Sequence, residues 1–213
     1  MKRVIFSVVS VFLLVIVIFY SWRYASNKRE LPCPSWLRWF VELDNPFTKY
    51  NRADVIIQHT NIKRGMHVID VGCGLGRLTI PLSKHVGPHG KVTAIDLQAE
   101  MIQRAKQKAK EKQLANIEFI QGKIGAGTLQ LAPCDRAMLV TVLGEILDQH
   151  EALKEIFHAL KPGGTLTVTE VIFDPHFQKR ETVLKLAKKV GFQEQNFFGH
   201  WAAYSMILEK PFD

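Results

Sequence analysis

The sequence predicts an α/β domain with a mainly parallel, doubly wound sheet covered by helices on both faces. Short apolar runs are typical of buried strands, amphipathic segments lie between them, and Gly, Pro or Asn mark many of the boundaries. Strands that alternate with helices in this way form βαβ units, which build a parallel sheet. Ligands of such sheets bind beyond the carboxyl ends of the strands.

The alternation begins near residue 52 and continues to residue 210. In the segment 99–112, Met101, Ile102, Ala105 and Ala109 form an apolar stripe and lysines fill the other faces, which indicates a solvated helix. The Lys-Pro-Gly-Gly sequence at 161–164 is expected to end a helix in a turn. The predicted helices are 52–60, 77–84, 99–112, 151–160 and 182–190, and the predicted strands are 67–71, 91–96, 117–121, 136–142, 165–171, 192–198 and 204–210.

Composition narrows the range of functions without selecting one. The 213 residues are 47% hydrophobic and 23% charged, as in a globular protein with one ordinary domain. A net charge of +8 suits nucleic acid, an anionic membrane face or anionic small molecules. The basic residues fall on helix faces and do not alternate with aromatic residues at strand ends, so a nucleic-acid partner is not expected. No obligate protein partner is inferred.

The cysteines and histidines predict neither disulfides nor a metal site. Cys33, Cys73 and Cys134 are an odd set without CxxC spacing, and the eight histidines are scattered. This pattern fits a reducing compartment.

Residues 1–30 have the pattern of a membrane anchor. Basic residues at 2–3 precede an apolar run from Val4 to Tyr20, and Trp22 and Tyr24 follow as interfacial aromatics. As a helix, Val4 to Trp22 would span roughly 28 Å, close to the thickness of the hydrocarbon core. A cleaved signal peptide and a buried helix are the alternatives, although no clear small-x-small cleavage site follows the run. We expect a single-pass membrane protein whose folded domain faces the cytoplasm.

A Trp-rich linker over 31–50 separates this anchor from a domain over 51–213. At helical spacing, Trp36, Trp39, Phe40 and Leu43 share one face. That face either covers a site for an apolar substrate as a lid or packs on the domain.

The glycine-rich segment VGCGLG follows the first predicted strand and opens the next helix. Glycines at 72, 74 and 76 give the spacing G-x-G-x-G, and Arg77 stands where a dinucleotide-binding loop has its third glycine, which argues against a nicotinamide-linked oxidoreductase. Asp70 precedes the loop and would repel a pyrophosphate but suit a ligand amine. Asp96 ends the second strand, where it can accept from ribose hydroxyls. These features describe a site for a cationic nucleoside without phosphates.

At these residues the chain resembles the class I S-adenosylmethionine-dependent methyltransferases, especially those that act on small acceptors and lipid quinones. The resemblance extends from about Asp54 to Lys210, through DVGCGLG, AID, FIQG, CDRAMLVTVLGEI and LKPGG. It implies a Rossmann-like, seven-stranded sheet with an antiparallel last strand, and S-adenosylmethionine as cofactor. The residues expected at the cofactor are Asp70, Gly72, Cys73, Gly74, Gly76, Asp96, Leu97, Gly122, Lys123, Ile124 and Thr141.

One residue departs from the family pattern. Lys123 stands where many members have an acid that accepts from the adenine amino group, and a lysine cannot accept. Either the backbone supplies that contact or the cofactor binds less tightly.

Methyl transfer itself demands alignment and exclusion of water rather than a fixed catalytic residue. An acceptor that must lose a proton needs a base, for which Glu145, His150 and Tyr50 are the candidates. The anchor favours a small, apolar or lipid-like acceptor. The alternative function is a membrane-tethered protein that binds S-adenosylmethionine without catalysis.

Overall fold

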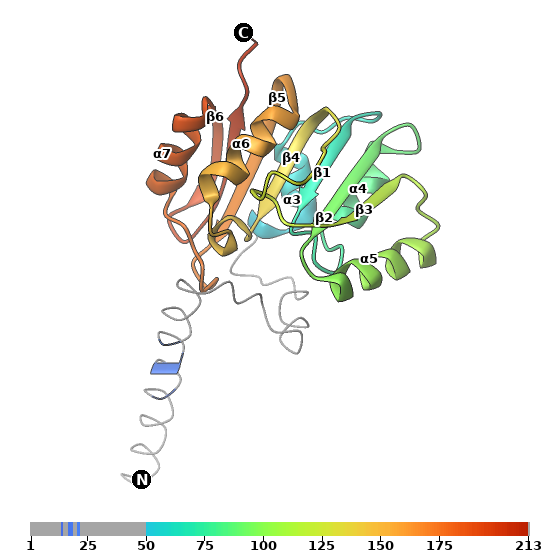
Figure 1. The fold of residues 1–213 in the computed structure, drawn as a ribbon, viewed down its shortest axis with the longest axis horizontal. Coiled ribbons are helices and arrows are strands. Elements are labelled where there is room, and N and C mark those ends of the chain that lie inside the picture. The colour runs from blue at the N-terminus through green and yellow to red at the C-terminus, as the bar shows by residue number, and fades with distance from the viewer. Residues whose placement is uncertain (1–13, 15–16, 19–20, 22–49, 213) are drawn as a thin grey trace.

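The computed structural model describes residues 14, 17–18, 21 and 50–212 (Figure 1). Most of the predicted anchor and the Trp-rich segment therefore lie outside the described residues. Among the helices that the described residues form, none is long and apolar enough to cross a bilayer.

Seven strands form one mixed sheet in the order β3-β2-β1-β4-β5-β7-β6. All strands are parallel except β7, which runs antiparallel to both β5 and β6. The predicted seven-stranded, Rossmann-like sheet with an antiparallel last strand is confirmed. Its strands are β1 His67–Val71, β2 Lys91–Asp96, β3 Ile117–Gln121, β4 Cys134–Val140, β5 Leu160–Val171, β6 Gln193–His200 and β7 Ala203–Glu209.

Helices cover both faces of this sheet (Figure 1). On one face Ile56 and Leu82 pack against Val68 of β1, and on the other Ile156 and Val183 lie in a core with Ile69. Neighbouring strand residues point to opposite faces, so Val68 and Ile69 supply one core each. The helices are α3 Ala53–His59, α4 Thr79–Val86, α5 Ala99–Glu111, the short 3₁₀ helix η2 Leu143–Glu145, α6 Gln149–Ala159 and α7 Arg180–Val190.

Several predicted boundaries are wrong: α4 begins at Thr79 rather than 77, α6 at Gln149 rather than 151, and α7 at Arg180 rather than 182. The largest differences lie around β4 and β5. The fourth strand begins and ends two residues earlier than expected, at Cys134 and Val140. The segment 161–164 is not a free turn, because β5 begins at Leu160 and the register with β4 shifts between Cys134 and Arg136. Backbone bonds to Lys210, each 2.9 Å long, pair this segment with the residues just after β7, while Gly163 keeps the positive φ of 71° expected of a turn glycine.

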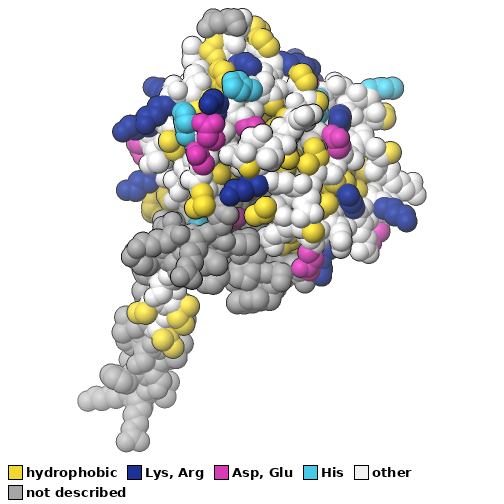
Figure 2. Space-filling model, in the orientation of Figure 1, with side chains coloured by type: hydrophobic (Ala, Val, Ile, Leu, Met, Phe, Trp, Pro, Cys, Tyr) yellow, Lys and Arg dark blue, Asp and Glu magenta, His cyan; other side chains and the backbone are white. Residues whose placement is uncertain are grey.

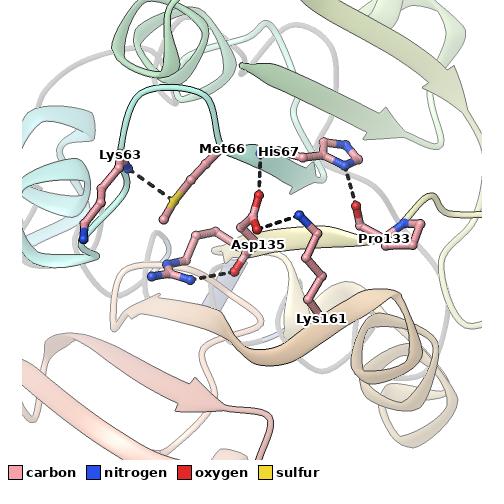
Figure 3. Close-up of polar contacts among 7 residues, drawn as sticks. Lys63, Met66, His67, Pro133, Asp135 and Lys161 are labelled. Carbon is pink, nitrogen blue, oxygen red and sulfur yellow. Dashed lines mark hydrogen bonds and ion pairs between the residues drawn. The ribbon is translucent and has the colours of Figure 1, made fainter. Parts of the chain in front are cut away.

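At the amino edge of the sheet, a polar cluster centred on Asp135 joins β1, β4 and β5 (Figure 3). Asp135 accepts the backbone N–H of His67 at 2.8 Å and the Nζ of Lys161 at 2.7 Å. Burial alone would raise the pKa of Asp135, but the hydrogen bonds from Lys161 and His67 hold it below its usual value.

We predict that Asp135→Ala lowers the free energy of unfolding by about 2 kcal/mol at neutral pH, because two bonds to a charged acceptor are lost. Denaturant titration measures the loss. Folding lowers the pKa of Asp135. The Asp135 carboxylate therefore stabilises the fold above its pKa in the unfolded chain, and this stabilisation is lost as the pH falls through its pKa in the folded protein. The control is Asp54→Ala, which removes an exposed pair with Arg52 and should cost less than about 0.5 kcal/mol. Equal losses in the two variants would contradict the assigned role.

Candidate functional site

The glycine loop after β1 is held over the end of β2 by backbone bonds. The N–H groups of Gly72 and Cys73 both donate to the carbonyl of Ile95, at 2.8 and 2.9 Å. One residue further on, the N–H of Gly74 donates to Asp96 Oδ2 at 2.8 Å. Loop and strand end therefore form one unit at the carboxyl edge of the sheet, where the sequence places the ligand.

Two of the loop glycines are required for different reasons. Gly72 has φ of 70°, and a Cβ there would overlap the side chain of Val142. Gly74 has φ of 51°, and a Cβ there would meet no atom within 4 Å. The space beside Gly74 is consequently open on the side that a ligand would approach.

Asp70 is buried at the base of this loop. Its Oδ2 accepts from the Thr79 hydroxyl at 2.6 Å, which ties β1 to the first turn of α4. Burial raises the pKa of Asp70 to about 6; Thr79 and the Arg77 charge oppose the shift, and the charge of Asp96 adds to it. The site thus contains a carboxylate that a nearby ligand cation would stabilise.

Asp96 links three segments of the site. Besides accepting from Gly74, it accepts the N–H of Gln98 at 2.9 Å through Oδ1, and its own carbonyl accepts from Gly122 at 3.0 Å. A carboxylate has about four lone-pair positions, so these two bonds leave acceptor capacity for ligand hydroxyls.

The remaining residues predicted at the cofactor lie around this unit in different environments. Leu97 and Lys123 are exposed beyond β2 and β3, whereas the side chain of Ile124 is buried in the core beside α6. Cys73 is also buried, and burial raises the pKa of its thiol, so it is not a nucleophile.

Thr141 follows β4 and has an uncommon backbone conformation. Its φ is 56°, a left-handed value that β-branched residues rarely adopt, and its N–H donates to the Thr169 carbonyl at 2.8 Å. Such strain is characteristic of functional sites. Here it redirects the chain toward η2 at the carboxyl edge.

Of the three candidate bases, Glu145 is the one that lies among other titratable side chains at this edge, with 33% of its side chain exposed. Burial raises the pKa of Glu145 to about 7; the charges of Asp174 and Asp96 act in the same direction, and His176 opposes them. His150 is exposed in the first turn of α6. Tyr50 lies against the end of β6, with its ring 5.7 Å from that of His200 and 6.4 Å from that of Phe198.

The sequence prediction missed two residues beside Glu145. His176 lies in the loop after β5, is buried, and has its Nδ1 3.9 Å from Glu145 Oε1 and 3.6 Å from Asp174 Oδ1. Asp174 Oδ1 also accepts the His176 N–H at 2.7 Å. The loop approaches so closely that a Cβ at Gly144 would overlap the His176 carbonyl. The one local signal was the sequence Asp-Pro-His directly after a strand.

Among residues 50–212, no group of three or more His, Cys, Asp or Glu side chains has the arrangement of a metal site. On the face drawn in Figure 2, Lys and Arg side chains are scattered among hydrophobic and acidic ones and form no continuous basic surface over the described part of that face.

The family model for a methyltransferase domain matches residues 62–207. The chain belongs to this family. The match contains the glycine loop, Asp96, Thr141, Glu145 and His176, whereas the candidate base Tyr50 lies before it.

Known proteins similar to this methyltransferase domain include two bacterial enzymes and a solved structure. Demethylmenaquinone methyltransferase of Lactococcus lactis is 40% identical over 106 residues, which are 50% of this chain and 42% of that protein. The enzyme of the same name from Geobacillus sp. strain WCH70 is 33% identical over 114 residues, 54% of this chain and 49% of that protein. The chain thus matches less than half the length of each relative.

The crystal structure of a SAM dependent methyltransferase from Aquifex aeolicus superimposes with a TM-score of 0.72 at 23% identity, covering 83% of this chain and 98% of that one. At 23% identity this similarity shows a shared fold, in agreement with the seven-stranded sheet described above.

Proposed function

We propose that the protein is an S-adenosylmethionine-dependent methyltransferase that acts on a membrane-associated, quinone-like ring. The observation that supports the cofactor most directly is the hydrogen bond from the Gly74 N–H to Asp96, which fixes a glycine loop beside a carboxylate within the matched methyltransferase domain. The similarity to demethylmenaquinone methyltransferases supports the class of acceptor.

The residues present suit this cofactor. The negative charge of Asp96 helps to raise the pKa values of both Asp70 and Glu145, so a positively charged ligand between these carboxylates would be favoured. The open space at Gly74 admits close approach of the ligand to the backbone. In our assignment Asp70 lies near the amine and Asp96 accepts from the ribose hydroxyls, while Leu97, Gly122, Lys123 and Ile124 border the adenine. When bound, the cofactor supplies an activated methyl group.

Glu145 is assigned as the group that takes the proton released by the acceptor. A base is most effective when its pKa is near the working pH, and the partly buried Glu145 carboxyl has a pKa of about 7. His176 Nδ1 lies 3.9 Å from Glu145 Oε1, and Asp174 contacts His176 in turn.

We propose that residues 1–30 anchor the chain in a membrane and that the domain faces the cytoplasm. Within the apolar run, Leu14, Val17 and Ile18 are helical and more than half exposed. Exposed apolar side chains on a helix suit a lipid-facing segment more than a helix buried in protein.

The affinity for S-adenosylmethionine is predicted to fall as pH drops through about 6, because protonation of Asp70 removes a negative charge beside the ligand amine. Calorimetric titration between about pH 5 and 8 measures this dependence. The matched control is Asp70→Asn, whose affinity should be weaker and should lack the change near pH 6. A flat profile in the unmodified protein would remove Asp70 from the cofactor site.

The functional test is transfer of a labelled methyl group from S-adenosylmethionine to demethylmenaquinone in vesicles that contain the full chain. Labelled menaquinone in the lipid extract is the expected product. Tight cofactor binding without transfer to any quinone or lipid would favour the alternative, a tethered S-adenosylmethionine-binding protein without catalysis.

A further inference from the structure

Exposed apolar side chains gather at one edge of the sheet. Leu97, Leu147, Phe173 and Trp201 follow the carboxyl ends of β2, β4, β5 and β6, and between 48% and 79% of each side chain is exposed. Trp201 belongs to this edge because β7 is antiparallel, so the β6–β7 turn lies where the parallel strands end. We call these four residues the carboxyl-edge rim.

The amino edge of the sheet has fewer exposed large apolar side chains among residues 50–212. Among residues 50–212, Phe212 is the one other large hydrophobic side chain with comparable exposure, at 78%, and it lies beyond β7 near the C-terminus, at the amino edge of the sheet (Figure 1). Four of the five such side chains therefore share the edge that contains the proposed cofactor site. Isolated exposed hydrophobic residues are normal, but a set on one edge indicates a contact surface.

The domain over residues 50–212 also begins at the carboxyl edge of the sheet. The Tyr50 ring packs on Phe198 and His200 at the end of β6, so the chain enters the domain beside Trp201. The sequence before this entry point contains the apolar run from Val4 to Tyr20, with a linker of residues 31–49 between the proposed anchor and the domain. An anchor attached here would bring the carboxyl-edge rim, rather than the amino edge, close to the bilayer.

Exposed charges of both signs lie near the rim, with Asp148 directly after Leu147 and two lysines at other strand ends. Lys123 follows β3 and Lys179 precedes α7, both at the carboxyl edge and both exposed. Lysines near a membrane surface are attracted to anionic lipids, and tryptophan is enriched at the interface between hydrocarbon and water.

We propose that the carboxyl-edge rim inserts into the surface of an anionic bilayer, as a second membrane contact distinct from the anchor. Leu147, Phe173 and Trp201 enter the interfacial layer, Leu97 stays at the adenine beside them, and the mouth of the site then opens toward the lipid. An acceptor dissolved in the membrane reaches Glu145 without crossing water. This inference rests on the proposed function for the membrane location of the acceptor.

The test places an environment-sensitive fluorophore on the full chain in vesicles of phosphatidylcholine with about one quarter phosphatidylglycerol. Cys33→Ser provides the background, because Cys73 and Cys134 are buried. One variant adds Phe173→Cys in the rim, and the matched control adds Phe212→Cys at the opposite edge. Lipids that bear a quencher should reduce the emission at position 173 at least about fivefold more than at position 212, because only the rim lies in the interface.

Equal, weak quenching at both positions in vesicle-bound protein would overturn the proposal, because the rim would then lie in water. Failure to bind vesicles would overturn it as well. If position 173 is shielded in the absence of lipid and the protein has the mass of a dimer, a second copy of the chain covers the rim. That result would contradict a lipid contact. Calorimetry of S-adenosylmethionine on the same preparation separates these outcomes from failure of the proposed function.

A second readout uses activity. Phe173→Ser combined with Trp201→Ser should raise the KM for a vesicle-embedded quinone about tenfold, because access to this acceptor depends on insertion of the rim into the interface. The KM for a short-chain, water-soluble analogue should stay unchanged. An equal change for both acceptors would indicate damage to the site rather than loss of membrane contact.

Discussion

Asp96→Ala is expected to raise the Kd for S-adenosylmethionine by about a hundredfold, because each hydrogen bond to a charged group is worth about 1.5–3 kcal/mol and 1.4 kcal/mol is tenfold in affinity. The variant loses the acceptor for Gly74 and Gln98, so the glycine loop is released from β2. It also loses the carboxylate assigned to the ribose hydroxyls. Calorimetric titration of the full chain measures both the affinity and the binding enthalpy.

The control for this prediction is Glu100→Ala, which removes an exposed acid four residues along the chain, paired with Arg104 on the surface of α5. Its Kd should change less than about twofold, since exposed ion pairs contribute little. Circular dichroism verifies that both variants are folded. Unchanged affinity in a folded Asp96→Ala protein would mean that the cofactor does not bind at this strand end.

Glu145→Gln is expected to lower kcat by about two to three orders of magnitude, the usual contribution of a positioned base. The glutamine has nearly the same shape, so the KM for the acceptor should change little. The carboxyl must be ionised to take a proton, and its pKa is about 7, so kcat/KM of the unmodified enzyme should fall below that pH. The residual activity of the variant should lack this acidic limb. Steady-state rates over a pH series test both statements.

Glu151→Gln is the matched control, because it makes the same chemical change on the exposed surface of α6, where Glu151 pairs with Lys154 at 3.4 Å. Its kcat should stay within about twofold of the unmodified value. A Glu145→Gln enzyme with nearly full kcat and an unchanged pH profile would show that another group, or water, accepts the proton.

The sequence predicted the parts of the site that depend on local pattern. Gly72, Gly74 and Gly76 are close together in the chain and directly follow a strand, so their place at the carboxyl edge can be inferred from the strand-loop-helix order. Asp96 could be placed for the same reason, as the last residue of the next parallel strand. Its bond to the Gly74 N–H could not be predicted, because that contact joins residues 22 positions apart and depends on loop conformation.

Contacts between distant segments account for the features that the sequence did not predict. His176 reaches Glu145 because the loop after β5 folds over Gly144, and no periodic pattern marks such a loop. The early start of β5 has a similar cause, since residues 163–164 are held by Lys210, which belongs to the other end of the domain. The Lys-Pro-Gly-Gly sequence correctly predicted the end of α6, at Ala159, but its own four residues belong to β5 rather than to a separate turn.

The most direct test of the proposed activity is transfer of radiolabelled methyl from S-adenosylmethionine by the full chain in vesicles that contain demethylmenaquinone. We expect label in menaquinone, strongly reduced by Asp96→Ala at cofactor concentrations near the Kd of the unmodified protein, and reduced about a hundredfold or more by Glu145→Gln. Absence of labelled lipid from a folded protein that binds the cofactor would contradict the proposed methyl transfer to a quinone.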